Sequence, residues 1–317
     1  MKKLILAAMT LFMGVSLFAC AETTTTITTT TAPLFDETKS INVYTRDTTS
    51  GTRTGFMEGI GFAAAATSDS VLVEGFIIKD NTGILSTMAI DEFGIGYISL
   101  SSLNNTVKGL SYNGVAPTEA NVMNNTYGLK RPFMWMLRQA GDYESADIEA
   151  IVNAFVAYLG TSDGGDIINN AGAIALPSST TWDSIKANHN VCTQDNSDVT
   201  VRFGGSDSIQ KVAQALTAAF MPKCGNFVAE HDHTGSSDAY KRTNDPAIKD
   251  TSVGKDVGFA SRNFRDAELT VSESLRGQLA WDAIVAIVHV NNPLMNVTPA
   301  QLKSIYDGTF GKWSDVE

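Results

Sequence analysis

Three segments of the chain share one pattern: a short β-rich run, a turn of Ser, Thr, Asp and Gly, and an amphipathic helix. The turns are residues 50–52, 205–208 and 235–238. Strands that alternate with helices predict an α/β fold. Strands are expected at 41–45, 94–100 and 199–203, and the clearest helix at 147–159. The second turn is followed by a core-facing helical stripe of Ile209, Val212, Leu216 and Phe220.

The start of the chain is predicted to lie outside this fold. Lys2 and Lys3 precede an apolar run that ends in Leu17-Phe18-Ala19-Cys20, which indicates a secretory signal peptide over residues 1–19. Cys20 at the cleavage point resembles the lipobox of bacterial lipoproteins and predicts a lipid anchor; the alternative is a plain signal peptide with a chance cysteine. Residues 20–39 form a Thr-rich tether. We therefore expect an exported lipoprotein of the cell membrane that faces outside.

Composition and charge exclude several classes of protein. With 43% hydrophobic and 18% charged residues, the chain is not intrinsically disordered. The net charge of −11 becomes −13 when residues 1–19, which hold two lysines and no acid, are removed. Nucleic acid is an unlikely partner for such a chain, because phosphate backbones require clustered Lys and Arg. Cys192 and Cys224 could form one disulfide or remain two buried thiols.

The repeated turns have the chemistry of a small-anion site. A helix N-terminus exposes unpaired N–H groups and carries a partial positive charge. Glycine allows close approach of a ligand, and hydroxyls add hydrogen bonds, so an oxyanion can bind without a basic surface. Arg46 and Arg53 flank the first turn and could supply a full charge, Arg46 through its bidentate fork. The alternative is that these turns are ordinary helix N-caps.

Several sequence blocks resemble the phosphate-binding (PstS-like) proteins of bacterial ABC phosphate importers. Residues 46–53, Arg-Asp-Thr-Thr-Ser-Gly-Thr-Arg, resemble the family's anion-binding turn. Residues 257–262 resemble its “IG-x-ASR” strand end. Further similar blocks are residues 114–118, 127–132, 279–294 and 298–313, the last with the Gly311-Lys312-Trp313 ending. The resemblance covers most of residues 40–176 and 199–317.

The order of these blocks differs from the order typical of the family, in which the Gly-Ser turn comes first. The resemblance therefore implies a circularly permuted, two-lobe periplasmic-binding-protein-like (type II) α/β fold with its ligand in the interlobe cleft. Residues 177–198 would be the joint, and permutation is tolerated where native termini lie close together. One lobe is expected to combine 40–102 with 283–317, and the other to span 103–282, including this connector.

The resemblance also implies a ligand site made by both lobes. The split lobe would contribute Arg46, Ser50, Gly51 and Thr52. The other lobe would contribute Ser206, Asp207, Ser208, Ser236 and Ser261.

Asp207 is a departure from the family pattern, because its position usually holds Thr or Ser. A second departure is Arg262, which stands where some members have Asp. A carboxylate at Asp207 could accept the P–OH proton of monohydrogen phosphate and reject sulfate, which has no such proton. Asp47 is the next candidate for this role.

These observations predict a monomeric solute-binding protein, not an enzyme, that binds inorganic phosphate and needs no cofactor. Its partners would be the membrane subunits of an ABC importer, and the membrane itself through the anchor. The alternatives are another tetrahedral oxyanion, a sensory role, or an exported phosphatase-like enzyme. Residues 230–233, Glu-His-Asp-His, contain metal-ligand types, but a solvated strand face is the preferred interpretation and no metal site is predicted.

Overall fold

The computed structural model describes residues 34–316. The predicted signal peptide, the lipid anchor at Cys20 and most of the Thr-rich tether lie outside the described residues. Within residues 34–316, no helix combines the length and apolar character needed to cross a membrane.

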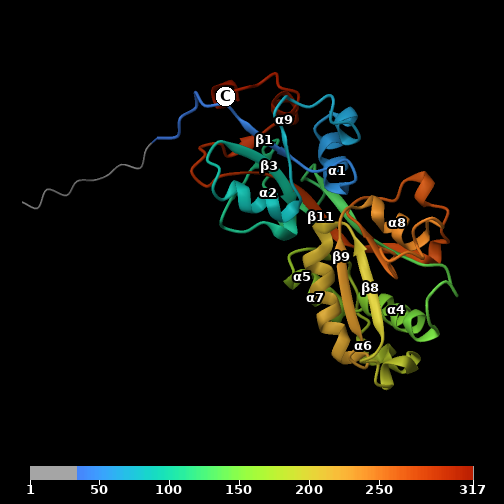
Figure 1. Cartoon of the computed structure of the whole chain (residues 1–317). Coiled ribbons are helices and arrows are strands. Elements are labelled where there is room, and N and C mark those ends of the chain that lie inside the picture. Colours follow the sequence, from blue (N-terminus) through green and yellow to red (C-terminus); the bar gives the residue numbers. More distant parts are fainter. Residues whose placement is uncertain (1–33, 317) are drawn as a thin grey trace, which may run out of the picture. The chain divides into compact units, whose positions relative to one another are not determined.

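A ten-stranded sheet passes through both lobes, with the strand order β2-β1-β3-β11-β6-β10-β8-β9 and with β4 and β7 paired to β11. The long strand β11 (Arg276–Val288) lies at the centre (Figure 1). Its first part pairs antiparallel with β6 (Lys130–Leu137), as far as Ala283 opposite Lys130. From Ile284 onward it pairs antiparallel with β3 (Gly94–Ser99). The strand therefore changes lobe between residues 283 and 284.

The first lobe surrounds a core in which aromatic rings pack against α1. The ring of Phe56 stacks on Tyr97 with centroids 4.0 Å apart, and Tyr306 packs edge-on at 5.2 Å. Its strands besides β3 are β1 (Asn42–Thr45), β2 (Ile77–Ile78), β4 (Lys108–Gly109), β5 (Ser111–Tyr112) and β12 (Asn296–Val297). Its helices are α1 (Gly51–Gly59), α2 (Asn81–Met88), α3 (Glu119–Met123) and α9 (Pro299–Tyr306). Thr298 and Gln301 form the capping box that begins α9.

The second lobe has its own core, which includes Phe155, Trp182, Phe203 and Phe220. Its strands besides β6 are β7 (Ile174–Ala175), β8 (Thr200–Gly205), β9 (Val228–His233) and β10 (Val257–Ala260). Its helices are α4 (Ala146–Leu159), α5 (Ser162–Asn170), α6 (Trp182–Ile185), α7 (Gln210–Phe220) and α8 (Ser237–Asn244). Strands β9, β8 and β10 are parallel, so their carboxyl ends meet at one edge of the sheet.

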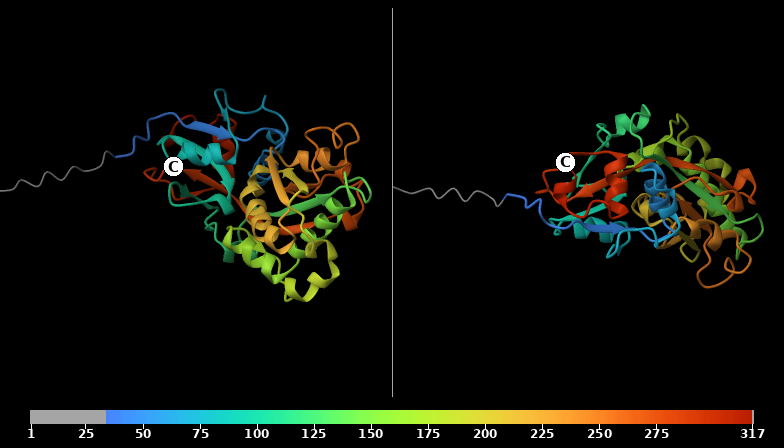
Figure 2. Two further views of the ribbon diagram at one scale, coloured as in Figure 1. Left: turned by 60° about the horizontal axis from the view of Figure 1, so that its bottom comes forward. Right: turned by 90° about the horizontal axis from the view of Figure 1, so that it is seen from above.

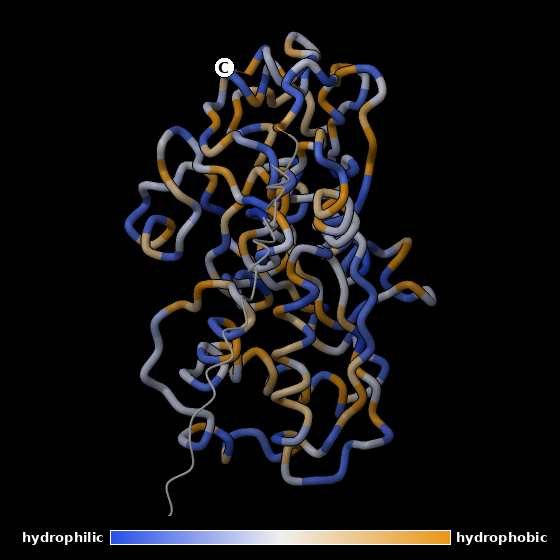
Figure 3. The backbone as a smooth tube through the Cα atoms, turned by 90° about the vertical axis from the view of Figure 1, so that its left-hand side faces the viewer, coloured by the Kyte–Doolittle hydropathy of each residue, from blue (hydrophilic) through white to orange (hydrophobic). Residues whose placement is uncertain are grey.

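The distribution of side chains agrees with two separate cores. Hydrophobic and hydrophilic stretches alternate along the backbone (Figure 3), and the buried hydrophobic residues of the two lobes form separate clusters. The blue-to-teal and deep-red segments of the chain lie together, apart from the green-to-orange segments (Figure 2). The first lobe is therefore built from both ends of the described chain, as the sequence predicts.

One predicted lobe boundary is wrong. Residues after 102 were expected in the second lobe, but Val107, Leu110, Tyr127 and Leu129 are buried in the first. Strand β4 holds this segment in place by pairing with Ile287 and Val288 of β11, and β5 pairs with β12. The chain crosses into the second lobe at 129–130, whereas the predicted boundary at 283 coincides with the crossing on β11.

The predicted connector, residues 177–198, folds onto the second lobe. Trp182 is 3% exposed and packs edge-on against Tyr158 and Phe220. Cys192 is joined to Cys224 by a disulfide across 32 residues. Of the two alternatives open for these cysteines, the structure contains the bridge, which ties the connector to the segment after α7.

Candidate functional site

The residues predicted to bind the ligand come together in one buried cluster where the two lobes meet. The Arg46 guanidinium contacts both carboxylate oxygens of Asp207, and its Nη1 lies 3.4 Å from Ser208 Oγ. Thr52 Oγ1 lies 2.5 Å from Ser208 Oγ. Arg46 and Thr52 belong to the first lobe, and Asp207 and Ser208 to the second. The cluster therefore bridges the lobes, and both lobes contribute polar groups to it.

The first-lobe side of the cluster is the connection between β1 and α1. Arg46 follows the last residue of β1, and Ser50 is the N-cap of α1, accepting a hydrogen bond from the Arg53 N–H at 3.4 Å. The backbone N–H groups at the start of α1 therefore face the cluster with the partial positive charge of the helix N-terminus. Arg46 is 0% exposed, and within the described residues its Nε has no hydrogen-bond partner. A buried N–H without an acceptor is costly, which indicates a position for an acceptor from outside the chain.

The second-lobe side consists of serine hydroxyls at the carboxyl edge of the sheet. Ser206 follows β8 and donates to Ser261 Oγ at 2.9 Å, while Ser261 follows β10. The Ser261 N–H donates to Ser236 Oγ at 2.9 Å, and Ser236 is the residue before α8. All three are at most 1% exposed. The parallel arrangement of β9, β8 and β10 brings the turns of Ser236, Ser206 and Ser261 together.

Gly51 lies where the N-terminus of α1 comes very close to the second lobe. A Cβ built at this position would lie 2.9 Å from Ser261 Oγ and well inside van der Waals contact with Ser236 Oγ. Real Cβ atoms essentially never come that close to another heavy atom. Only glycine lets the N-terminus of α1 reach the serines of the other lobe in this arrangement.

Arg131 is a second buried cation of the cluster that the sequence analysis quoted only as part of a motif. It lies on β6, its Nη1 donates to Thr52 Oγ1 at 2.7 Å, and its Nε donates to Asp282 at 2.9 Å. Asp282 also accepts from Ser99 Oγ at 2.8 Å. Burial lowers the pKa of Arg131 and raises the pKa of Asp282, and their mutual attraction opposes both shifts. The Arg-Pro pair of the 127–132 block was the sequence signal that could have identified this residue.

Arg53, the other candidate cation, is not part of the cluster. Its guanidinium is buried beneath α1, where Nε donates to the Ala65 carbonyl at 2.7 Å and Nη1 pairs with Asp69 at 2.6 Å. It thereby anchors the segment after α1. The full positive charges at the cluster come instead from Arg46 and Arg131.

The carboxylates near the cluster differ in what they contact. Asp207 engages Arg46 and also accepts from the Asn81 N–H at 3.1 Å. Asp47 caps its own turn, accepting from the Thr49 N–H at 2.7 Å. Asp207 is therefore the better placed of the two candidates for an acceptor beside the cluster.

Arg262, which stands where an aspartate was considered, is bound to its own loop. Its guanidinium makes a bidentate pair with Glu268, with distances of 2.7 and 2.8 Å. The residue therefore adds no carboxylate to the cluster, and Asp207 has no competitor at this position.

The paired histidines of β9, His231 and His233, make hydrogen bonds to each other and to the chain around them. His233 Nδ1 lies 3.0 Å from the carbonyl oxygen of Ser206, and His233 Nε2 lies 3.0 Å from His231 Nδ1. A carbonyl can only accept, so His233 donates from Nδ1 and accepts at Nε2 from His231. Among the described residues no group of three or more His, Cys, Asp and Glu side chains could hold a metal ion. The pair supports the Ser206 turn through its backbone.

Stability is expected to fall below about pH 6 because of this histidine pair. Burial lowers the pKa of His231 and of His233 to about 4, whereas an unfolded chain has the ordinary value of about 6.5. Between these values the unfolded chain binds more protons, so the free energy of unfolding decreases as the pH falls. Across this range one histidine should lower the free energy of unfolding by on the order of 3 kcal/mol. That loss corresponds to a decrease of roughly 5 °C in Tm.

Thermal unfolding of wild type and of the His231→Gln/His233→Asn variant, from pH 7 to pH 4, measures this effect. The variant should lose clearly less Tm than wild type over this range. His289→Gln, which lies in the first lobe outside the pair, should follow wild type. Equal losses in all three proteins would contradict the prediction.

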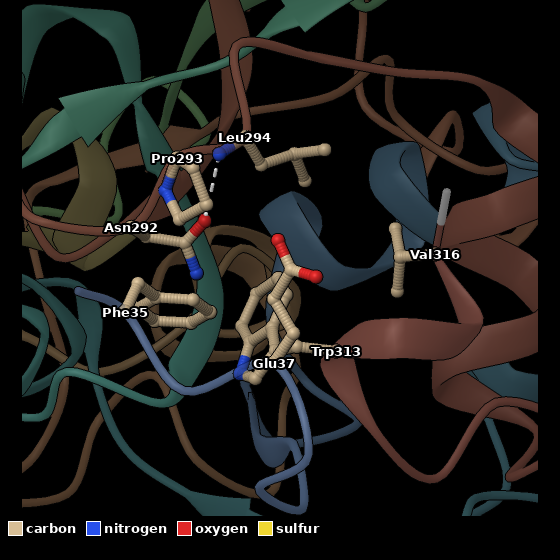
Figure 4. Close-up of a pocket in the computed structure, with 7 residues that line it drawn as sticks. All are labelled: Phe35, Glu37, Asn292, Pro293, Leu294, Trp313 and Val316. Atoms are coloured by element: carbon tan, nitrogen blue, oxygen red, sulfur yellow. Dashed lines mark hydrogen bonds between the residues drawn. The ribbon is translucent and has the colours of Figure 1, made fainter.

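A hollow on the first lobe lies apart from the cluster. It is lined by Phe35, Glu37, Asn292, Pro293, Leu294, Trp313 and Val316 (Figure 4). Apolar side chains dominate its walls, and it contains none of the predicted binding residues. A carboxylate among apolar walls is unsuited to an anion, so this hollow is not the predicted site.

Comparisons with known proteins agree with this architecture. Residues 190–317 match the model of the PBP superfamily domain. The phosphate-binding protein PstS 2 of Streptococcus agalactiae is 26% identical over 289 residues, which cover 87% of this chain and 88% of that protein. The protein of the same name from Streptococcus pneumoniae is 25% identical over 284 residues, 88% of each chain.

A solved structure has the same fold. It is the crystal structure of a phosphate-binding protein of a phosphate ABC transporter from Streptococcus pneumoniae, with a TM-score of 0.62 and 21% identity, covering 88% of this chain and 100% of that one. The two-lobe periplasmic-binding-protein-like fold and the resemblance predicted from the sequence are confirmed. A circular permutation relative to other members stays a prediction.

Proposed function

We propose that this protein binds inorganic phosphate between its two lobes and passes it to the membrane subunits of an ABC importer. The observation that carries the proposal is the interlobe cluster, in which Arg46, Arg131 and the start of α1 meet the hydroxyls of Thr52 and the facing serines. Such a set of donors suits a small tetrahedral oxyanion. The relatives named above, which are phosphate-binding proteins, support the choice of phosphate.

The net negative charge of the chain is compatible with this ligand. Arg46 and Arg131 are buried beside the proposed ligand position. Acidic groups on the distant surface act on the ligand through solvent and salt, which screen them within about 8 Å at physiological ionic strength. At the site the charges of Arg46 and Arg131 are balanced by Asp207 and Asp282, and the N-terminus of α1 adds a partial positive charge. A single small anion can therefore bind where a polyanion would be repelled.

Asp207 is proposed as the acceptor that selects phosphate. Its carboxylate lies against Arg46 at the edge of the cluster, and its side chain is 9% exposed. Monohydrogen phosphate can donate its P–OH to this carboxylate, whereas sulfate would bring only acceptor oxygens against a negative charge. A buried acceptor left without its donor disfavours the wrong anion.

The arrangement favours binding over hydrolysis. A hydrolase of this kind would need a hydroxyl nucleophile beside a general base. Within the described residues, the histidine nearest the cluster contacts Ser206 only through the backbone carbonyl, and its other ring nitrogen is taken by His231. The serine hydroxyls of the cluster instead contact one another. We propose that the protein acts as a receptor that closes on phosphate without changing it.

Anchoring completes the proposal. A lipid at Cys20, followed by the Thr-rich tether, would keep a monomeric receptor at the outer face of the cell membrane. Mass spectrometry of the membrane fraction measures the lipid, and Cys20→Ser should release the protein into the medium. Retention of that variant at the membrane would disprove the anchor.

Calorimetric titration with phosphate, sulfate and molybdate at two pH values tests the function. Wild type, without its signal peptide, should bind phosphate tightly with one high-affinity site and prefer it strongly to sulfate. Asp207→Asn should reduce the ratio of phosphate to sulfate affinity by about 10-fold or more, because an amide can donate to sulfate and no longer repels it.

Asp47→Asn is the matched control, since it removes one carboxylate from the neighbouring turn and should keep the selectivity of wild type. Loss of selectivity in this control, with Asp207→Asn unchanged, would transfer the role to Asp47. Absence of tight phosphate binding in wild type would disprove the function itself.

A further inference from the structure

A second hollow opens between the lobes directly beside the cluster. It is lined by Thr54 and Glu58 of α1, by Lys130 and Arg131 at the start of β6, and by Arg262 and Arg265 after β10. Arg131 and Ser261 line this hollow and also belong to the cluster. The hollow therefore adjoins the proposed phosphate site.

The hollow gathers cations in a chain that is strongly acidic overall. Arg131 and Arg262 are paired with Asp282 and Glu268. Lys130 and Arg265, by contrast, make no ion pair with any residue in 34–316. The Lys130 ammonium lies 3.9 Å from the ring centre of Trp281 and donates to Asn125 at 2.9 Å.

Arg265 joins the two lobes at the rim. Its Nη2 lies 3.4 Å from Thr54 Oγ1 on α1, so a first-lobe helix faces a second-lobe guanidinium across the hollow. Glu58 is the one acidic residue among those that line it. Lys130 and Arg265 outnumber Glu58, so the lining keeps a net positive charge.

An unsatisfied donor supports a ligand at this place. Arg262 is 7% exposed, and its Nε has no hydrogen-bond partner among the residues that the structure describes. Buried polar groups are normally paired, and each exception needs an explanation. An acceptor that enters the hollow would neutralise Lys130 and Arg265, and a small shift of the Arg262 side chain would bring its covered Nε–H to the same acceptor.

We propose that this hollow is a second, weaker oxyanion site that captures phosphate at the entrance to the cluster. The inference rests on the proposed function and adds a residue set to it. Its ligand is a phosphate dianion, which could be free or carried by a phosphomonoester. A charged entrance raises the local concentration of the anion and so its rate of association.

The test compares wild type with the Lys130→Gln/Arg265→Gln variant, both without the signal peptide. Association of inorganic phosphate is followed by stopped-flow tryptophan fluorescence at low and high salt. The variant should associate about 5-fold more slowly at low salt, and the difference should shrink at high salt because screening removes the attraction. A Lys303→Gln/Lys312→Gln control changes the net charge equally at residues that do not line the hollow, and should keep the rate of wild type.

Phosphorus NMR of phosphate-saturated protein measures the weak site directly. Added millimolar phosphate should show exchange broadening with wild type and with the control, and none beyond free phosphate with the Lys130→Gln/Arg265→Gln variant. Broadening by glycerol phosphate but not by phosphate would assign the hollow to esters and overturn capture of the free anion. The proposal would also be overturned if the Lys130→Gln/Arg265→Gln variant associated with phosphate as fast as wild type, or if it still showed exchange broadening of added phosphate. Failure of tight binding in wild type would instead disprove the proposed function, so the two failures are distinguishable.

Discussion

Replacing Asp282 with alanine is expected to lower the free energy of unfolding by about 3–5 kcal/mol. Asp282 is 1% exposed, and its carboxylate contacts Arg131 and the hydroxyl of Ser99. Its loss leaves the Arg131 guanidinium buried without its counter-charge, close to Arg46. An uncompensated buried charge costs far more than the net value of the ion pair that held it.

Urea unfolding followed by circular dichroism measures this loss. Asp250→Ala is the matched control, because Asp250 pairs with Arg138 at 3.0 Å but its side chain is 65% exposed. The buried Arg138 keeps Asp256 as a second counter-charge, so the loss should be about 1 kcal/mol. Asp282→Asn should fall between the two, since the amide keeps part of the hydrogen bonding. Equal losses of unfolding free energy in Asp282→Ala and Asp250→Ala would show that burial of the Asp282–Arg131 pair does not increase the cost of breaking it.

This pair illustrates what the sequence could not predict. Asp282 and Arg131 face each other because they are register partners of β11 and β6, and they are 151 residues apart in the chain. Local sequence patterns carry no register between distant strands. The turns that contain Ser50, Ser206 and Ser236 were predictable, because each follows a strand and precedes a helix. Only the turns of Ser206 and Ser236 follow parallel neighbouring strands, so the approach of Ser50 to them depends on how the two lobes pack.

The misplaced lobe boundary has a similar cause. The segment after residue 102 joins the first lobe through β4 and β5, each two residues long, and so short a strand has no detectable alternation. Tyr127 and Leu129 are buried there by contacts with distant residues; the Tyr127 hydroxyl, for example, donates to the Ile284 carbonyl at 2.9 Å. The polar composition of the connector likewise concealed that Trp182 is a core residue. In each case contacts between residues far apart in the chain determine where the segment packs, and local composition does not reveal those contacts.

Gly51→Ala is expected to weaken phosphate binding by about 100-fold, which corresponds to about 2.7 kcal/mol. The added methyl would lie 2.9 Å from Ser261 Oγ and closer still to Ser236 Oγ, so the lobes could not close to the arrangement of the structure. Overpacking of this size costs about 1–3 kcal/mol. An arrangement with the lobes further apart would have no such clash, and alanine favours a helix over glycine. Stability without ligand should therefore be unchanged or slightly higher.

Calorimetry with phosphate, together with thermal unfolding of the ligand-free protein, separates loss of closure from loss of folding. Gly311→Ala is the matched control, because a Cβ there would meet nothing within 4 Å, and it should bind as wild type does. Two requirements conflict at position 51. Alanine at the first position would stabilise α1, but glycine lets the N–H groups of α1 reach the other lobe. Wild-type affinity in Gly51→Ala would mean that phosphate binds without the close approach of α1 to Ser236 and Ser261, and the interlobe cluster would then be the wrong site.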